Sequence, residues 1–272
     1  MKTKITFLFL VILLQTSNAF AFRIPFIIIG DDTRQKVATT PMEDPSVYES
    51  IGQITINKGD LGWFSCTATV IGQFHILTAA HCVLDLQGRE AVQVRFYPAR
   101  GLDVNIPSSK RVINSKKIYY HPYYRFSRTP QFDIAVVELE KELPVRALPL
   151  GRTPVWKTSR LLRRPLITWP FAWPVSDVKV KIAGYPGDKA RGQMWEGTGR
   201  LAFRDPIRPN RYDVDTYPGQ SGSAIRVRRR GQDVIIGVHS SGHNLPNDPH
   251  NLGAMLDDQK IKLIQEWISK KE

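Results

Sequence analysis

Three short segments of the chain hold the residue types of a nucleophilic catalytic site. Ser221 lies in segment 219–223, Gly-Gln-Ser-Gly-Ser, where a tight turn between small residues leaves a hydroxyl accessible. His81 lies in segment 78–82, Thr-Ala-Ala-His-Cys, and Asp133 directly precedes an apolar run. A serine hydroxyl becomes an effective nucleophile when a histidine removes its proton and an aspartate orients that histidine. The order His81, Asp133, Ser221 is one in which such triads occur, so we predict a triad of these residues.

This triad would carry out acyl transfer, with His81 as general base and then general acid. Asp133 would hold the imidazole in the correct tautomer and stabilise its cation. The backbone N–H groups of Gly219 and Ser221 are predicted to bind the developing oxyanion, each contributing on the order of 3 kcal/mol. Taken alone, the segment around Ser221 would also fit an ordinary Gly/Ser loop. The separations of 52 and 88 residues suit a cleft between two barrels, with His81 and Asp133 in the first and Ser221 in the second.

The segments that position these residues have the pattern of an all-β protein. Short runs rich in β-branched and aromatic residues alternate with Gly, Pro, Asn and Asp, at spacings typical of a barrel or a sandwich. Only the tail, 257–270, has apolar residues at helical spacing, and we expect this helix to pack on the barrel. The clearest strands are predicted at 51–56, 64–71, 75–80, 91–97, 134–139, 178–183 and 234–238.

Together, these motifs resemble the chymotrypsin-like serine protease family from about residue 28 to the C-terminus, and within it the bacterial glutamyl endopeptidase (V8-like) branch. Segment 28–37, Ile-Ile-Gly-Asp-Asp-Thr-Arg-Gln-Lys-Val, is similar to the mature N-terminus of that branch, and segments 215–223 and 236–239 are similar to its nucleophile and pocket segments. The resemblance implies an all-β fold of two six-stranded antiparallel β-barrels with a C-terminal α-helix. It places the protease domain at 28–272, with a first barrel at about 28–145, a second barrel at about 175–256 and the helix at 257–270.

The first residues have the features of a secretory signal peptide. Two lysines precede an apolar run at 5–14, and Ala-Phe-Ala at 19–21 places small residues where a signal peptidase cleaves. We therefore predict a signal peptide at 1–21 and a secreted or periplasmic protein. Residues 22–27 would be a short propeptide or simply the start of the mature chain. The apolar run is too short to span a bilayer, and no later segment is long and apolar enough.

Cys66 and Cys82 are the two cysteines of the chain. In an oxidising compartment an even number of cysteines indicates a disulfide, and the family resemblance implies the same pairing. Such a bond would tie the turn that carries His81 to the strand that carries Cys66, and two free buried thiols are the alternative. Two cysteines without partners at ligand spacing do not make a metal site, and we expect no cofactor.

The chain is strongly basic, with a net charge of +13, of which two charges belong to the lysines of the predicted signal peptide. Such a surface attracts nucleic acid, anionic envelope polymers or acidic proteins by long-range steering. Segment 226–230, Arg-Val-Arg-Arg-Arg, is followed by a glycine and fits the exposed tip of a hairpin, so we interpret it as a solvated face rather than a nucleic-acid site. The expected partners are protein or peptide substrates, without specific nucleic acid, and the expected state is a monomer.

Four residues bear on which peptide bond is cut. Asp215 lies six residues before Ser221, where trypsin-like enzymes hold the aspartate that attracts Arg or Lys. His239 and Thr216 match, by the resemblance, the histidine and hydroxyl with which glutamyl endopeptidases bind a substrate carboxylate, and both can donate charge-assisted hydrogen bonds to it. Ser240 begins a segment that would pair with extended substrate backbone. We predict cleavage after Glu, with Asp slower; trypsin-like cleavage after Arg or Lys is the alternative.

Gln220 is a departure from trypsin-like enzymes, which carry at this position an aspartate that pairs with a newly cut N-terminal amine. Activation by that ion pair is therefore not expected, and the resemblance implies that a mature N-terminal amine near Ile28 adds positive charge to the pocket. Segment 155–174 mixes Trp, Pro and basic residues and would be an enlarged linker or a partner-binding surface. The main alternative to a secreted serine endopeptidase is a catalytically silent binding protein of the same fold; the intact triad favours the enzyme.

Overall fold

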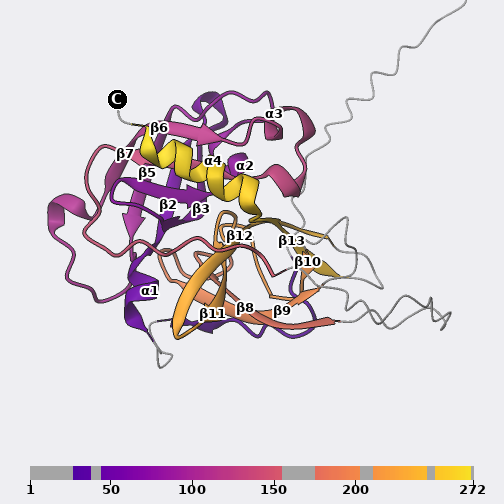
Figure 1. Ribbon diagram of the computed structural model, residues 1–272. Helices are drawn as coiled ribbons and strands as arrows, with labels where there is room; N and C mark the ends of the chain where they lie inside the picture. Colours follow the sequence, from indigo (N-terminus) through magenta and orange to yellow (C-terminus); the bar gives the residue numbers. More distant parts are fainter. Residues whose placement is uncertain (1–26, 38–43, 155–174, 203–210, 244–248, 271–272) are drawn as a thin grey trace, which may run out of the picture.

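The computed structural model describes residues 27–37, 44–154, 175–202, 211–243 and 249–270. The predicted signal peptide, residues 22–26 and the Trp- and Pro-rich segment 155–174 lie outside these residues. The described chain forms two β-barrels, which lie one above the other in Figure 1, and a C-terminal helix crosses the outside of the upper one.

The first barrel closes in the strand order β2-β3-β4-β7-β6-β5, and all of its pairs are antiparallel. Its strands are β2 (Ile51–Asn57), β3 (Trp63–Val70), β4 (His75–Thr78), β5 (Gln93–Pro98), β6 (Ile113–Tyr120) and β7 (Ala135–Leu139). In β5 every second residue is buried, because successive side chains of a strand point to opposite faces. A Cβ atom at Gly52 would lie 2.2 Å from the ring of Phe96, so a glycine is needed where this ring packs against β2.

The second barrel closes in the order β8-β9-β10-β13-β12-β11, since β8 pairs with both β9 and β11. All of these pairs are antiparallel, and the short strand β1 (Gln35–Lys36) joins the barrel along β9. The six barrel strands are β8 (Val175–Gly184), β9 (Trp195–Ala202), β10 (Arg211–Tyr212), β11 (Ala224–Arg229), β12 (Gln232–His243) and β13 (His250–Met255).

Strand β9 was not predicted because its sequence contains Gly197 and Gly199, and glycine is depleted in strands. The structure gives the reason for both residues. An added Cβ at Gly197 would lie 2.7 Å from the side chain of Val214, and one at Gly199 would lie 2.4 Å from the side chain of Asp213. The glycines therefore let the chain that leads to the Ser221 turn pass directly over β9.

The hairpin of β11 and β12 corrects one interpretation of the arginine-rich segment. Arg230 and Gly231 form its tip, both with positive φ angles, as the tightest hairpin turns require. Arg226, however, is only 1 % exposed, and its guanidinium lies over the ring of Tyr48 in α1 (Pro45–Glu49), 5.4 Å from the ring centroid. Its guanidinium forms ion pairs with Asp233, at 2.7 Å, and with Glu196. The end of this segment is thus a solvated hairpin tip, whereas its first residue is buried and ion-paired. The ion pairs are needed because a buried cation is costly without paired carboxylates.

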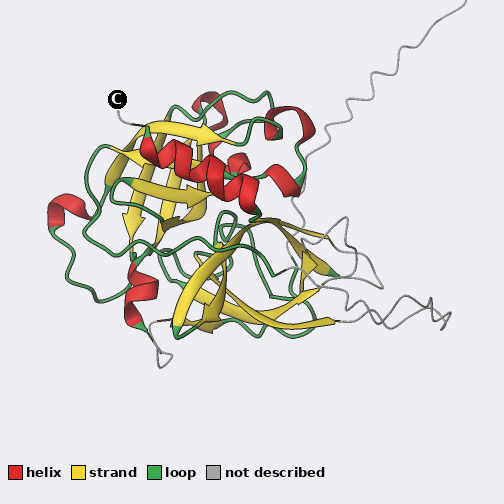
Figure 2. Cartoon of the chain, viewed as in Figure 1, coloured by secondary structure: helices red, strands yellow, loops and turns green. Residues whose placement is uncertain are grey.

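Helices are few in the described chain, as Figure 2 shows, and α4 (Asp258–Ser269) is the longest of them. Asp257 caps its N-terminus by accepting a hydrogen bond from the N–H of Lys260, and Trp267 packs on the first barrel with its ring stacked 6.2 Å from that of Tyr119. No helix among the described residues is long and apolar enough to cross a bilayer. The shorter helices are α1 (Pro45–Glu49), α2 (Ala80–Val83) and α3 (Tyr124–Ser127), with 3-10 turns at Gly59–Leu61, Ser108–Lys110 and Pro130–Phe132.

The predicted fold class is confirmed. The protein is all-β apart from these helices, with two closed six-stranded antiparallel barrels followed by a C-terminal α-helix.

Candidate active site

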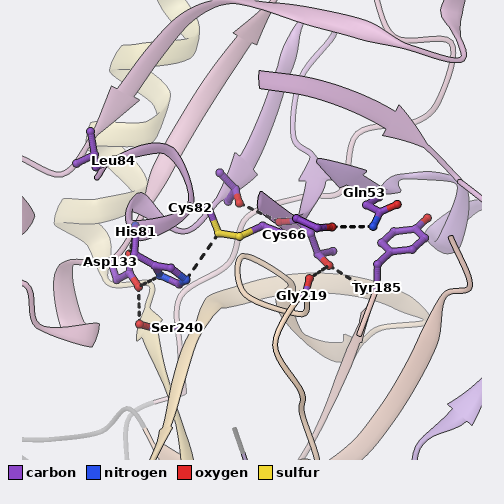
Figure 3. Close-up of a disulfide and its surroundings, with 12 residues drawn as sticks. Gln53, Cys66, His81, Cys82, Leu84, Asp133, Tyr185, Gly219 and Ser240 are labelled. Atoms are coloured by element: carbon purple, nitrogen blue, oxygen red, sulfur yellow. Dashed lines mark hydrogen bonds and ion pairs between the residues drawn. A yellow bond between two sulfur atoms is a disulfide. The ribbon is translucent and has the colours of Figure 1, made fainter. Parts of the chain in front are cut away.

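His81 and Asp133 meet because two paired strands end at the same edge of the first barrel. Thr78, at the end of β4, pairs with Ala135, at the start of β7, so the residues just after β4 and just before β7 are neighbours. His81 lies in the single helical turn α2 that follows β4. Its backbone N–H donates to Asp133 Oδ1 at 2.8 Å, and its ring Nδ1 lies 2.6 Å from Asp133 Oδ2 (Figure 3).

A third hydrogen bond to Asp133 comes from the second barrel. Ser240, on β12, donates its hydroxyl to Asp133 Oδ2. Burial by itself would raise the pKa of Asp133, but the charge of His81 and the hydrogen bonds from His81 and Ser240 hold this pKa below its ordinary value. An ionised carboxylate can only accept hydrogen bonds, so Nδ1 of His81 carries the proton and Nε2 is left as the basic nitrogen.

A disulfide between Cys66 and Cys82 joins α2 to strand β3. The Sγ atom of Cys82 lies 3.8 Å from Nε2 of His81, so the bond runs beside the Nε2 edge of the imidazole (Figure 3). Both sulfur atoms are consumed by the bond, and therefore neither offers a thiolate to a metal ion.

Lys58 is a contributor to the His81 turn that sequence reasoning missed. Its ammonium donates to the carbonyl oxygens of His81, at 2.7 Å, and Leu84, at 2.9 Å, at the C-terminal end of α2. Burial lowers the pKa of Lys58 to about 8, against the opposing effect of the carboxylates of Asp85 and Asp133. A lysine in a polar turn has no sequence feature that separates it from a solvated one, so only the fold reveals this contact.

The turn that carries Ser221 packs against the first barrel. The N–H of Thr67 donates to the carbonyl of Ser221 at 2.8 Å, and the Thr67 hydroxyl donates to the carbonyl of Gly219 at 2.9 Å. Gly222 has a φ of +83°, and a Cβ there would lie 2.1 Å from Oγ1 of Thr78, so the turn requires this glycine. The structure thus places Ser221 against the strands that lead to Cys66 and His81.

No hydrogen bond links the Ser221 hydroxyl to His81 among the described residues. The structure therefore brings His81 and Asp133 into direct contact, and brings Ser221 beside them without that last bond. Nucleophile–base hydrogen bonds are often long in proteins without substrate and tighten when substrate binds.

The two N–H groups predicted to form the oxyanion hole are oriented by the carbonyls of their own peptide planes. The carbonyl of Pro218 accepts from the N–H of Gly187 at 2.7 Å, and the carbonyl of Gln220 accepts from the N–H of Ser223 at 3.0 Å. Since C=O and N–H of a trans peptide point in opposite directions, the N–H groups of Gly219 and Ser221 face away from these partners. Within the described chain neither N–H donates a backbone hydrogen bond, so both are available to an oxyanion.

Gln220 links the turn that carries Ser221 to the N-terminal segment. Its side-chain oxygen accepts from the Arg34 guanidinium at 3.2 Å and from the N–H of Tyr217 at 3.0 Å. The Arg34 side chain is fully buried and also pairs with Asp32, at 2.8 Å, and Asp188, at 2.5 Å. A glutamine–arginine contact therefore occupies the place that an aspartate–amine pair has in trypsin-like enzymes. Sequence reasoning missed Arg34, because nothing in its own segment marks it as buried.

Asp215 is occupied by the same N-terminal segment. Its Oδ1 accepts from the N–H of Ile29 at 2.8 Å, and its Oδ2 accepts from the N–H and the hydroxyl of Thr33, at 2.9 and 2.6 Å. The carboxylate is therefore buried and satisfied by three donors. It is not the free carboxylate that the alternative of cleavage after Arg or Lys requires.

His239 and Thr216 are both buried in the second barrel. His239 Nδ1 contacts the hydroxyl of Tyr212, and that hydroxyl donates to the carbonyl of Leu252 at 2.9 Å. A hydroxyl has a single proton, so the neutral imidazole donates from Nδ1 to Tyr212 and leaves Nε2 unprotonated. Burial lowers the pKa of His239 to about 3, and the charge of His81 acts in the same direction. Tyr212 was not predicted; a tyrosine in a two-residue strand has no distinguishing sequence feature.

Unpartnered polar atoms cluster near Thr216. The Thr216 hydroxyl and the side-chain oxygen of Asn251 are buried, and neither has a hydrogen-bond partner among the described residues. The N–H of Thr216 donates to the carbonyl of Ile27 at 3.1 Å, and the Asn251 amide donates to the same carbonyl at 3.3 Å. Thr216 and Asn251 therefore bind the same carbonyl of the N-terminal segment.

The fold and these contacts define a serine endopeptidase of the two-barrel type. The family model described as Trypsin matches residues 43–268, and the chain belongs to this family.

Among curated relatives, glutamyl endopeptidases are similar to this chain. The glutamyl endopeptidase of Bacillus licheniformis is 28 % identical over 246 residues, which cover 88 % of this chain and 68 % of the relative. That of Staphylococcus epidermidis is 24 % identical over 218 residues, which cover 80 % of this chain and 67 % of the relative. A solved structure of a Glu endopeptidase is similar with a TM-score of 0.66 and 25 % identity, and the match covers 90 % of this chain and all of that one.

Proposed function

We propose that this serine endopeptidase uses His81, Asp133 and Ser221 as its catalytic triad and cleaves after glutamate, with aspartate slower. One observation carries the catalytic part of the proposal. The Asp133 carboxylate is buried and binds both the backbone N–H and the ring Nδ1 of His81, which leaves Nε2 as a base beside the Ser221 turn.

In the proposed reaction, the Ser221 hydroxyl attacks the scissile carbonyl while His81 Nε2 takes its proton. The oxygen of the tetrahedral intermediate binds the N–H groups of Gly219 and Ser221, each contributing on the order of 3 kcal/mol. His81 then gives the proton to the leaving amine, and the C–N bond breaks. Water, deprotonated by His81, releases the acyl group from Ser221. Asp133 keeps the imidazole in one tautomer throughout and stabilises its cation.

The preference for glutamate rests on His239 and Thr216. In this proposal the carboxylate of the substrate binds Nε2 of His239 and the hydroxyl of Thr216, which has no hydrogen-bond partner in the part of the chain that the structure describes. A mature N-terminus near Ile28 would add an amine to the same cluster, because the carbonyl of Ile27 already binds the N–H of Thr216. Asp215 supports this choice over arginine or lysine, since its carboxylate is occupied by Ile29 and Thr33.

Binding of a glutamate side chain would be coupled to a proton. The neutral His239 of the free protein presents an unprotonated Nε2, which cannot donate to a carboxylate. The substrate carboxylate would therefore bind together with one proton, either on its own oxygen or on His239. Affinity for a Glu substrate should accordingly fall with rising pH more steeply than affinity for the matched Gln substrate.

The first test uses active-site labelling and one substitution. A fluorophosphonate should label the parent at Ser221, and Ser221→Ala should abolish both labelling and peptide hydrolysis while leaving the fold intact. Turnover by Ser221→Ala within tenfold of the parent would overturn the triad assignment. A parent that is folded but neither labelled nor active would instead support the silent binding protein.

The second test uses a matched peptide series with Glu, Gln, Asp, Arg or Lys before the scissile bond. We expect Glu first and Asp second, and we expect His239→Gln to reduce the preference for Glu over Gln. A preference for Arg over Glu that disappears in Asp215→Ser would establish the trypsin-like alternative.

We also propose export through the signal peptide at 1–21, with the protease domain at 28–272 and residues 22–27 as a short propeptide or the mature start. The disulfide between Cys66 and Cys82 supports export, because such bonds persist mainly in oxidising compartments. N-terminal sequencing of the protein recovered from the medium and the periplasm tests this; a cell-associated chain that still begins at Met1 would contradict it.

A further inference from the structure

A cavity of about 550 Å³ lies beside the oxyanion turn, and neither the proposed triad nor the proposed glutamate pocket uses it. Gly219 and Pro218 form one wall, and Tyr185, Gly187 and the start of β3 form others. The cavity therefore opens directly next to the place where a scissile carbonyl would bind.

The cavity lies on the side of the site toward which the substrate residues after the scissile bond would extend. Figure 3 shows Asp133 and Ser240 on one side of His81, and Gly219, Gln53 and Tyr185 on the other, beyond the disulfide. If the segment that begins at Ser240 pairs with the substrate residues before the scissile bond, the residues after it must extend to the opposite side. That side holds the cavity.

The charged side chains that line the cavity are all positive. Three of the residues that line it in the described chain are cations, namely Arg95, Lys189 and Arg191, and none of the lining residues is acidic. Lys189 already has partners, since its ammonium lies 2.8 Å from Asp32 Oδ2. Arg95 and Arg191, in contrast, form no ion pair with any residue that the structure describes.

Two aromatic residues at the start of β3 line the cavity, and one of them holds a cation in place. Trp63 and Phe64 are about half exposed, at 50 % and 46 %, which is unusual for such large apolar side chains. The Arg95 guanidinium stacks over the Trp63 ring at 4.7 Å from the ring centroid. A stacked guanidinium keeps the N–H groups of its edge free and oriented, which suits bidentate binding of a carboxylate.

We propose that this cavity is a specificity site for an acidic side chain in the second or third residue after the scissile bond, with Arg95 and Arg191 as the residues that bind the carboxylate. This inference rests on the proposed serine protease mechanism. It adds a second preference, on the other side of the cut bond, to the proposed preference for glutamate before it.

Acyl transfer isolates this site from the rest of the reaction. A small ester donor, with no amino acid after the scissile bond, forms the acyl-enzyme at Ser221: its ester C–O bond breaks, and the alcohol leaves with the Ser221 proton transferred by His81. The amine of an added peptide then competes with water for the acyl group. Its nitrogen forms a bond to the acyl carbon as the bond to Ser221 Oγ breaks, and His81 transfers the proton of the amine to that oxygen. The ratio of transfer to hydrolysis reports how well the added peptide binds after the scissile bond.

The acceptors are Ala-Glu-Ala-amide and Ala-Ala-Glu-amide, compared with the same peptides in which Gln or Lys replaces Glu. We expect the better Glu acceptor to exceed its Gln counterpart by about tenfold at low salt, and the ratio to shrink in 0.5 M NaCl, because exposed charge pairs are screened. Arg95→Gln and Arg191→Gln should each lower the Glu-to-Gln ratio, and the double variant should bring it near one. Because both acceptors are compared on the same variant, a general loss of activity cancels.

Arg230→Gln is the matched control, since it removes one exposed arginine at the β11–β12 tip, outside the cavity, and it should keep the parent ratio. Equal transfer to Glu and Gln in the parent, or a Glu preference that survives the double variant, would overturn the proposal. Failure of the ester donor to acylate the parent would count against the proposed mechanism instead, so the two failures are distinguishable.

Discussion

Thr67 links the two barrels at the turn that carries Ser221, and its hydroxyl is the most informative single group to remove. The residue is fully buried. Its hydroxyl donates to the carbonyl of Gly219 at 2.9 Å and accepts from the N–H of Tyr185 at 3.0 Å. Thr67→Val keeps the shape of the side chain and deletes both hydrogen bonds at once.

The expected cost follows from these two contacts. Each partner of Thr67 is left as a buried polar group without a hydrogen bond, at about 1–3 kcal/mol each. The methyl group that replaces the hydroxyl returns about 1 kcal/mol of burial. The free energy of unfolding should therefore fall by about 1–5 kcal/mol, which corresponds to a drop in Tm of about 2–20 °C in a protein of this size. Catalysis should suffer in kcat more than in KM, because the Gly219 peptide loses an anchor beside the oxyanion site.

Thr69, two residues along β3, is a matched control. It is also fully buried, but its hydroxyl has no hydrogen-bond partner among the described residues. Thr69→Val should leave the free energy of unfolding unchanged or raise it by about 1 kcal/mol, since it removes an unsatisfied buried group. Denaturant unfolding, followed by tryptophan fluorescence in the Ser221→Ala background to prevent self-digestion, gives both values. Equal destabilisation by Thr67→Val and Thr69→Val would refute the reasoning.

Three further predictions follow from the site. Replacing Cys66 and Cys82 together by alanine opens a disulfide with a sequence separation of 16 residues and should lower the free energy of unfolding by about 3 kcal/mol in the same assay; unchanged stability would contradict it. Asp133→Asn should lower kcat by about 10⁴-fold by favouring the wrong tautomer of His81, and a loss below tenfold in steady-state kinetics would speak against that role. A histidine of the unfolded chain binds a proton near pH 6.5, whereas buried His239 does so only near pH 3. Between these values the unfolded state binds more protons, so stability falls as the pH drops, by on the order of 4 kcal/mol. His239→Gln should reduce this loss and lower the midpoint of acid unfolding relative to the Ser221→Ala parent; an unchanged midpoint would rule out His239 as its source.

Local patterns in the sequence were sufficient for the all-β class and for the identity of the candidate catalytic residues, whereas the two barrels came from the family resemblance. Alternating and β-branched runs identify most of the barrel strands, and helical spacing identifies α4, because these patterns depend only on neighbouring residues. The glycines around Ser221 and the motifs of His81 and Asp133 are also local signals. Strand β9 was missed because its glycines serve a backbone crossing that is not local.

The hydrogen-bond partners of several side chains depended on the tertiary structure. The position of Asp215 in the sequence also fitted a cation-binding pocket, which was the alternative prediction; its carboxylate instead binds Ile29 and Thr33, more than 180 residues away in the chain. Ser240 was expected to contribute backbone to substrate binding, and its hydroxyl also binds Asp133, 107 residues away.

The tertiary structure also decided which charged side chains are buried and what charge the cavity carries. Arg226 and Arg34 look like surface arginines in the sequence, and each is buried only because carboxylates from other strands and turns surround it. The acid-free cavity beside Gly219 is built from β3, β5 and the segment after β8, and its charge is the sum of residues that no sequence window contains. A motif defines which groups can react, whereas the packing of distant segments decides what each group contacts, how well it is solvated and therefore how it ionises.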